Sequence, residues 1–215
     1  KKIKEICKSS NRSICFFSGY DCDSLALEKI TNFSRYFINL FRNLKGHFLE
    51  IRTKSVNISF LKNIKVTKNV IIAFSLNPND IISEFEIKTP SLKKRIKAIS
   101  YLQGLGWNIG LRFDPVMYSN NFEECYKFFF KEIFSNINSK KIHSITIGSF
   151  RMPKKFFSKL SKIRPFDNFL YQNYKASMAV VGHEKKNEIQ EFCLNEIKKN
   201  IPMPKIYFLI KIFCL

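Results

Sequence analysis

The chain has 215 residues, 45% of them hydrophobic, and 37 Lys and Arg against 17 Asp and Glu give a formal net charge of +20. This length is enough for one domain with a sizeable core, and this composition excludes an intrinsically disordered chain. So positive a chain attracts polyanions, which favours a nucleic acid such as DNA as partner, although lysines scattered over a solvated surface would give the same count.

No stretch approaches the roughly 18 apolar residues of a membrane span, so we expect no membrane association. The sequence has six cysteines, and none of them forms a CxxC or CxxxCxxC pattern: Cys7, Cys15, Cys22, Cys125, Cys193 and Cys214. A chain of this length without a secretory signature is not a disulfide framework. We therefore expect reduced thiols and a cytoplasmic protein.

Apolar runs of strand length alternate with amphipathic runs of helical length in the first half of the chain. Residues 13–19 (SICFFSG) predict a strand, and 24–44 a helix capped by Asp23 or Ser24 and ended by Gly46. Residues 47–53 (HFLEIRT) predict the next strand and 56–62 a short helix.

The alternation continues after residue 68. Further strands are predicted at 69–76 (NVIIAFSL), 108–113 and 142–147, the first of them followed by a loop at 77–80. Helices are predicted at 91–105, 121–136, 153–162 and 184–200.

Five buried strands separated by helices predict an α/β fold with a parallel sheet covered by helices. Eight such units would close a TIM-like barrel, so five predict a partial one. We expect residues 1–165 to form an incomplete barrel and residues 166–215 an extension of the same domain. The apolar end, 207–215, is either native or the product of a frameshift.

In a parallel barrel the active site collects at the carboxyl ends of the strands. Polar side chains lie at or just after the carboxyl end of every predicted strand: Tyr20 and Cys22; Arg52 and Lys54; Ser75 and Asn77; Arg112, Asp114 and Tyr118; Ser149 and Arg151. The alternation of a strand puts Arg52 and Lys54 on one face, where two cations need an anionic partner. A ligand can supply that anion, or Arg52 can pair with Glu50 on the same face.

A series of short motifs runs through the chain in a constant order from about residue 13 to about residue 165. Its members are Asp23-Ser24-Leu25-Ala26-Leu27, Arg52-Thr53-Lys54-Ser55, Ala73-Phe74-Ser75-Leu76-Asn77-Pro78, Phe85-Glu86, Thr89-Pro90-Ser91-Leu92, Arg95-Ile96, Gly106-Trp107, Arg112-Phe113-Asp114-Pro115 and Ile142-His143-Ser144. The series resembles that of the spore photoproduct lyase family of radical S-adenosylmethionine (SAM) proteins. Many motifs in one order are more specific than any single motif.

The resemblance implies a partial (β/α)6 barrel that holds a 4Fe–4S cluster through a CxxxCxxC loop and binds SAM as its second cofactor. It also implies a lyase that repairs thymine dimers in DNA, or acts on a related substrate, after a radical is formed from SAM. A base must leave the helical stack to be reached by such an enzyme. Lys54 and Ser75 match SAM-contacting positions of the family, and we expect them to bind the cofactor together with Asn77.

For the substrate and the chemistry we expect a second set of residues from the same strand ends. Arg52, Arg112, Asp114 and Tyr118 are expected to bind substrate. The hydrogen-donor cysteine of the spore enzyme falls near Tyr20, and Cys22 lies two residues further on. Cys22 can substitute for that cysteine, or it is an ordinary loop thiol and the chain belongs with relatives that act on other substrates.

The sequence departs from the family in lacking CxxxCxxC, so we expect the first strand and the cluster loop to be missing and this chain to bind no metal. As it stands the chain is then expected to be inactive, as a fragment, a decayed gene or half of a split one. The alternative function is that of a non-enzymatic basic domain, or a decayed remnant, that binds nucleic acid.

Overall fold

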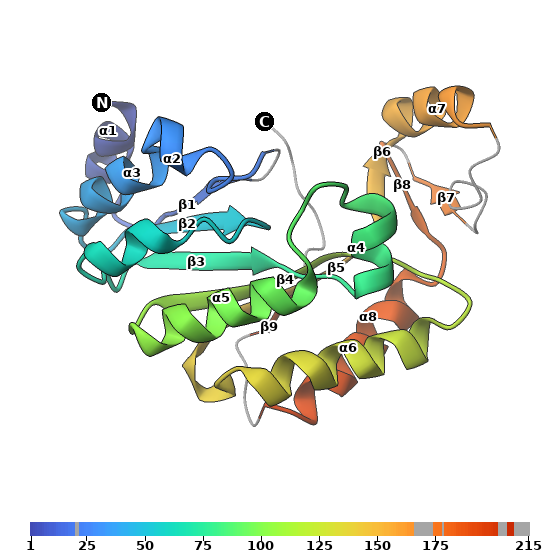
Figure 1. Ribbon diagram of the computed structural model, residues 1–215. Coiled ribbons are helices and arrows are strands. Elements are labelled where there is room, and N and C mark those ends of the chain that lie inside the picture. The colour runs from blue at the N-terminus through green and yellow to red at the C-terminus, as the bar shows by residue number, and fades with distance from the viewer. Residues whose placement is uncertain (20–21, 166–173, 178, 202–205, 209–215) are drawn as a thin grey trace.

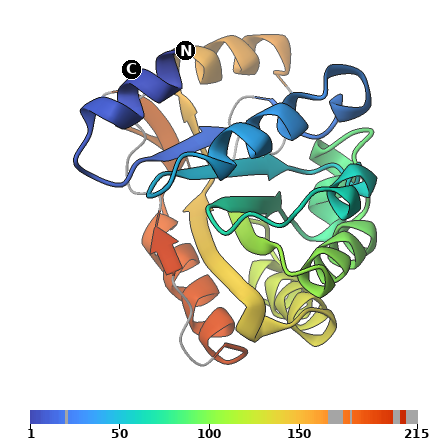
Figure 2. The same cartoon turned by 90° about the vertical axis from the view of Figure 1, so that its left-hand side faces the viewer.

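The computed structural model describes residues 1–19, 22–165, 174–177, 179–201 and 206–208. Six parallel strands form the main sheet, in the order β1-β2-β3-β4-β5-β9. They are β1 (Cys15–Ser18), β2 (Phe48–Thr53), β3 (Val70–Ser75), β4 (Asn108–Val116), β5 (Ile142–Ser149) and β9 (Ile206–Phe208). The sheet curves into a partial barrel (Figure 2), which confirms the predicted fold class.

Helices connect the strands, and several of them cover the faces of the main sheet (Figure 1). In chain order they are α1 (Lys2–Ser9), α2 (Glu28–Thr31), α3 (Phe33–Arg42), the 3-10 helix η1 (Ser59–Asn63), α4 (Asn79–Phe85), α5 (Leu92–Gly104), α6 (Phe122–Asn136), the 3-10 helix η2 (Ser139–Lys141), α7 (Lys154–Ile163) and α8 (Lys186–Lys198). None of the described helices combines the length and the hydrophobicity needed to cross a bilayer.

A second, antiparallel sheet of three short strands stands beyond the carboxyl ends of the main sheet, next to α7 (Figure 1). It consists of β6 (Arg151–Pro153), β8 (Val180–His183) and β7 (Tyr174–Ala176), in that order. The chain enters this sheet directly from β5, so it lies close to the strand ends where a barrel site is expected.

The core explains why these segments are strands and helices. Every residue of β3 is buried, as expected for a parallel strand covered on both faces. Behind the sheet, α6 contributes Phe129, Phe130 and Ile133, and α8 contributes Ile189, Cys193 and Ile197 to the same apolar cluster. The helix α8 therefore belongs to the same core as the strands of the barrel.

Two predictions about elements need correction. The predicted helix 24–44 is broken at Asn32, whose φ of 51° is left-handed, a conformation that Asn tolerates. The buried carboxylate of Glu28 accepts hydrogen bonds from the backbone N–H groups of Ser34 (2.7 Å) and Arg35 (3.1 Å), which caps the start of α3. The predicted loop 77–80 runs directly into α4, which pattern analysis missed because the helix has only seven residues.

The strand count was also too low. Five parallel strands were predicted, and the described residues form six, because Ile206–Phe208 pairs with β5. This strand overlaps the start of the apolar segment 207–215, for which the sequence left open a native or a frameshift origin. Residues 209–215 of that end lie outside the described part of the chain.

Candidate functional site

A cavity of about 450 Å³ opens at the carboxyl ends of the strands. Each of the first five strands supplies at least one lining residue at or near its end: Gly19, Lys54, Ser75, Asp114 and Arg151. Thr53 of β2 pairs with Phe74 of β3, so that Lys54 and Ser75 follow on adjacent strands. Lys54 and Ser75 thus line the same cavity, as the sequence predicted.

Lys54 is held by carboxylates at both of its ends. Its backbone N–H donates to Oδ2 of Asp23 (2.6 Å), and its ammonium lies 2.9 Å from Oε1 of Glu86. The same Glu86 oxygen accepts a hydrogen bond from Nδ2 of Asn77 (2.9 Å). Burial opposes ionisation of Glu86, but Lys54 and Arg95 outweigh it and hold the pKa of Glu86 below its ordinary value.

Asp23 organises the loop after β1. Its Oδ1 accepts hydrogen bonds from the backbone N–H groups of Leu25 and Ala26, both at 2.8 Å, and from the hydroxyl of Thr53 at 2.7 Å. The sequence analysis named Asp23 as a capping candidate and as part of a motif, and missed that it joins the β1 loop to the end of β2. Its place in a motif beside a strand end was the available signal.

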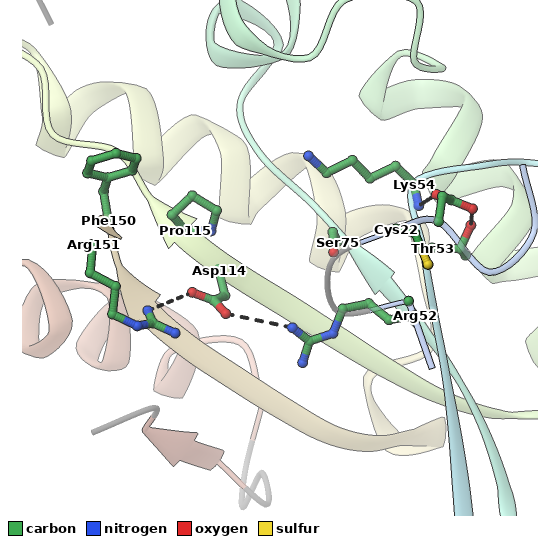
Figure 3. Close-up of a pocket in the computed structure, with 11 residues that line it drawn as sticks. Cys22, Arg52, Thr53, Lys54, Ser75, Asp114, Pro115, Phe150 and Arg151 are labelled. Carbon is green, nitrogen blue, oxygen red and sulfur yellow. Dashed lines mark hydrogen bonds and ion pairs between the residues drawn. The ribbon is translucent and has the colours of Figure 1, made fainter. Parts of the chain in front are cut away.

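Arg52 lies between two carboxylates. It contacts Oε1 of Glu50 at 3.3 Å, the pairing that was considered for it as an alternative to a ligand. It also lies 3.7 Å from Oδ2 of Asp114, whose other oxygen is 3.0 Å from Nη1 of Arg151 (Figure 3). Asp114 therefore bridges two guanidinium groups at the wall of the cavity. Arg151 was not among the predicted binding residues, because its role depends on β5 ending beside β4.

Arg112 does not reach the cavity. Its side chain is buried inside the barrel and forms a two-point ion pair with Glu50, with Nε–Oε1 at 3.0 Å and Nη2–Oε2 at 2.7 Å. It also donates to the hydroxyl of Ser144 (3.0 Å). Burial opposes ionisation of Glu50, but Arg112 and Arg52 outweigh it and hold the pKa of Glu50 low. The expected substrate-binding role does not fit this placement, and we assign Arg112 to the barrel interior.

Tyr118 also lies away from this cavity. It lines a separate hollow between α6 and α8, where its ring is 4.5 Å from that of His183 and 5.5 Å from that of Phe122. Its phenol accepts a hydrogen bond from Lys185 at 3.4 Å. A substrate confined to the main cavity would not contact Tyr118.

Of the two candidate catalytic residues, Cys22 lies in the described part of the chain. Cys22 is exposed and lines the cavity beside Arg52 (Figure 3). Tyr20 lies outside the described residues. Cys22 is thus placed where it can meet a bound substrate, which both interpretations of this thiol allow.

The donor sets decide which cofactors these residues suit. Among the described residues no three His, Cys, Asp or Glu side chains gather into a metal-binding group, so this part of the chain does not fit a 4Fe–4S cluster. The chemistry of SAM suits Lys54, whose ammonium-bearing side chain lines the main cavity together with the hydroxyl of Ser75 and a smaller neighbouring hollow together with the amide of Asn77. In the described structure Oδ1 of Asn77 is buried without a hydrogen-bond partner, which a ligand hydroxyl or N–H would satisfy.

A family model described as "Spore photoproduct lyase" matches residues 4–210. The chain belongs to the spore photoproduct lyase family. A spore photoproduct lyase of Clostridium acetobutylicum is 23% identical over 202 residues, which are 87% of this chain and 58% of that protein. The Bacillus subtilis enzyme is 24% identical over 164 residues, 76% of this chain and 46% of its own. The chain thus spans about half the length of these relatives of the spore photoproduct lyase family.

Solved structures share the fold. A spore photoproduct lyase complexed with dinucleoside spore photoproduct superposes with a TM-score of 0.82 at 18% identity, over 96% of this chain and 65% of that one. A variant with bound AdoMet and the same dinucleoside gives a TM-score of 0.80 at 18% identity, over 96% and 64%. This likeness shows that the partial barrel is the fold of the spore photoproduct lyase family.

Proposed function

We propose that this chain forms the SAM-binding and substrate-facing part of a radical SAM lyase that repairs thymine dimers in DNA. The observation that carries the proposal is the joint placement of Lys54 and Ser75 at one mouth of a spore photoproduct lyase barrel. When bound to a reduced cluster, SAM supplies the radical that starts such a reaction. The residues of this chain bind, orient and shield the reactants.

The cofactor side of the mouth is polar and directional. The ammonium of Lys54 suits the carboxylate of SAM or its ribose hydroxyls, and the hydroxyl of Ser75 can bond to either. The unsatisfied Oδ1 of Asn77 offers an acceptor to a hydroxyl or an N–H. Together these groups recognise a ligand that carries both an anion and hydrogen-bond donors.

The substrate side is formed by Arg52, Asp114 and Arg151, with Cys22 beside them. Asp114 orients both guanidinium groups, whose N–H donors suit the carbonyl oxygens of a base or phosphate oxygens. A dinucleoside lesion is the ligand of one of the matched spore photoproduct lyases, and this supports a lesion of the same kind as ligand here. We propose DNA as the partner and Cys22 as the thiol nearest to the lesion.

The cluster requires ligands that these 215 residues lack, because no CxxxCxxC occurs in them. We therefore predict that this polypeptide alone binds no iron–sulfur cluster and is inactive. Anaerobic reconstitution followed by iron and sulfide analysis is the measurement. A stoichiometric four-iron cluster would contradict the prediction.

The second candidate is a non-enzymatic domain that binds nucleic acid through its positive charge. The net charge of +20 and the exposed lysines of α7 favour it. Such a domain would bind DNA and have no affinity for SAM. SAM binding therefore separates the two candidates.

The test is isothermal titration of the 215-residue chain with SAM, for the parent, Lys54→Ala and Lys97→Ala. A charged hydrogen bond contributes about 1.5–3 kcal/mol, so Lys54→Ala should weaken binding roughly tenfold to a hundredfold. Lys97 is an exposed lysine of α5 on the covering layer, and its replacement should leave the affinity unchanged. Equal affinity of the Lys54 variant and the parent, or no binding by the parent, would remove the case for this site.

A further inference from the structure

A buried ion pair between Glu86 and Arg95 lies next to the cavity and contacts all three residues expected to bind the cofactor. Oε1 of Glu86 meets both Nζ of Lys54 and Nδ2 of Asn77, each at 2.9 Å. Nη1 of Arg95 donates to the backbone carbonyl of Ser75, also at 2.9 Å. One carboxylate and one guanidinium thus join groups from the ends of β2 and β3.

Glu86 is itself firmly held. Its side chain is 4% exposed and that of Arg95 is 0% exposed, and the second carboxylate oxygen, Oε2, faces Nη2 of Arg95. Nε of Arg95 donates to the carbonyl of Pro90 (2.9 Å), and Nη2 donates to the hydroxyl of Thr89 (2.7 Å) as well. These partners all belong to the segment between the end of β3 and α5, so the carboxylate is presented from a rigid frame.

The position of Glu86 restrains Lys54, whose flexible four-carbon chain would otherwise sample many rotamers. The side chain of Lys54 is 36% exposed, so packing alone would leave it free to adopt other orientations. The contact with Glu86 holds the ammonium beside Asn77 before any ligand arrives. Less conformational entropy is then lost when the ligand binds.

Glu86 also decides which end of the Asn77 amide is free. A carboxylate only accepts hydrogen bonds, so it must face Nδ2, and this turns Oδ1 away from it. Asn77 and Lys54 line a smaller hollow of about 240 Å³, and Oδ1 has no partner among the described residues. The amide is thereby fixed as an acceptor for a ligand.

We propose that Glu86, anchored by Arg95, is a positioning residue of the cofactor site, and that its negative charge is what holds Lys54 and orients Asn77. The proposal rests on the proposed function, in which Lys54 binds SAM. The replacement Glu86→Gln removes the charge that holds Lys54 but keeps an oxygen that can accept from Nδ2 of Asn77, so it should weaken SAM binding mainly when Lys54 is present.

The test is a thermodynamic cycle of SAM binding, measured by calorimetry on the 215-residue chain: parent, Glu86→Gln, Lys54→Ala and the double variant. Glu86→Gln should weaken binding about fivefold to twentyfold in the parent and at most about twofold in the Lys54→Ala background, because residues of one network are not additive. Glu84→Gln, an exposed glutamate two residues away, is the matched control and should change nothing.

The outcomes separate the two proposals. A loss of equal size in both backgrounds, or none in the parent, overturns the positioning role while Lys54 keeps its own. Parent-like binding by Lys54→Ala overturns the proposed function and the positioning role with it. If Glu86→Gln does not fold, the Glu86→Gln/Arg95→Met variant replaces it in the same thermodynamic cycle. Removing both charges leaves no unpaired buried ion.

Discussion

Removal of the Glu50 carboxylate should destabilise the barrel strongly, since Glu50 is the counter-ion of a buried cation. Glu50 and Arg112 have side chains that are each 3% exposed, and two hydrogen bonds join them. Removing one member of a buried pair costs about 3–5 kcal/mol. After Glu50→Ala, Arg112 still donates to the hydroxyl and the carbonyl of Ser144, so we expect the lower end of that range, about 3 kcal/mol.

The assay is urea and thermal unfolding followed by the fluorescence of Trp107, the single tryptophan, which is 2% exposed in the native state. For a chain of this size a loss of about 3 kcal/mol lowers Tm by roughly 6–12 °C. Glu123→Ala is the control, because among the described residues Glu123 forms only an exposed ion pair with Lys127, whose loss should cost less than about 0.5 kcal/mol.

A double variant and the pH dependence of stability test the role of the Glu50–Arg112 pair further. Replacing both partners, as Glu50→Leu with Arg112→Met, should recover most of the stability, because no unpaired charge remains. The pKa of Glu50 is lowered in the folded state, so its contribution is present above the ordinary value of 4.5 and is lost as the pH falls through the folded value. A loss below about 1 kcal/mol for Glu50→Ala at pH 7, or no rescue by the double change, would refute the assignment.

Two other predictions concern the mouth and the thiols. Gly19→Ala should destabilise the protein more than Gly46→Ala. Both glycines have a positive φ, which costs alanine about 1–3 kcal/mol of strain, but only at Gly19 would the new methyl group also meet the carbonyl of Arg52. Equal losses of stability in urea unfolding would contradict this prediction. Iodoacetamide at pH 8 should alkylate the exposed Cys22 and spare Cys193, because burial raises the pKa of the Cys193 thiol far above its ordinary value. Mass spectrometry of the native protein is the measurement, and alkylated Cys193 would show that α8 opens.

The sequence predicted the sheet well because its signal is local. Continuous apolar runs such as 69–76 are long enough and β-branched enough to be read as buried strands without knowledge of their neighbours. The break at Asn32 was missed because apolar residues continue at near-helical spacing across it. The left-handed Asn32 ends α2, and the Glu28 carboxylate caps the start of α3 through the N–H groups of Ser34 and Arg35, contacts that hydrophobic periodicity does not report.

The candidate site was predictable where it depends on strand order and unpredictable where it depends on pairing. Lys54 and Ser75 come together because consecutive parallel strands end side by side. Arg112 was misplaced because its partner Glu50 lies 62 residues away, although both are charges at inward positions of apolar strands, a pattern that could have suggested the pair. Glu86 was quoted only as part of a motif, since nothing local shows that it meets both Lys54 and Asn77.

The positive charge of the chain and the chemistry of its mouth are separate properties. At the cavity every cation that the proposals use has a carboxylate beside it: Glu50 and Asp114 for Arg52, Glu86 for Lys54, and Asp114 for Arg151. The excess charge lies elsewhere, for instance on α7 beyond the strand ends, which exposes Lys154, Lys155, Lys159 and Lys162.

Charges paired in this way contribute little long-range attraction but present fixed hydrogen-bond donors at short range. Exposed surface lysines do the opposite, since they attract a polyanion from a distance and distinguish little among its bases. It follows that salt should weaken any DNA binding by this chain through the lysines. Arg52, Asp114 and Arg151 would provide the preference for one base structure over another. This preference should change much less with salt, because partly buried ion pairs are screened less than exposed charges.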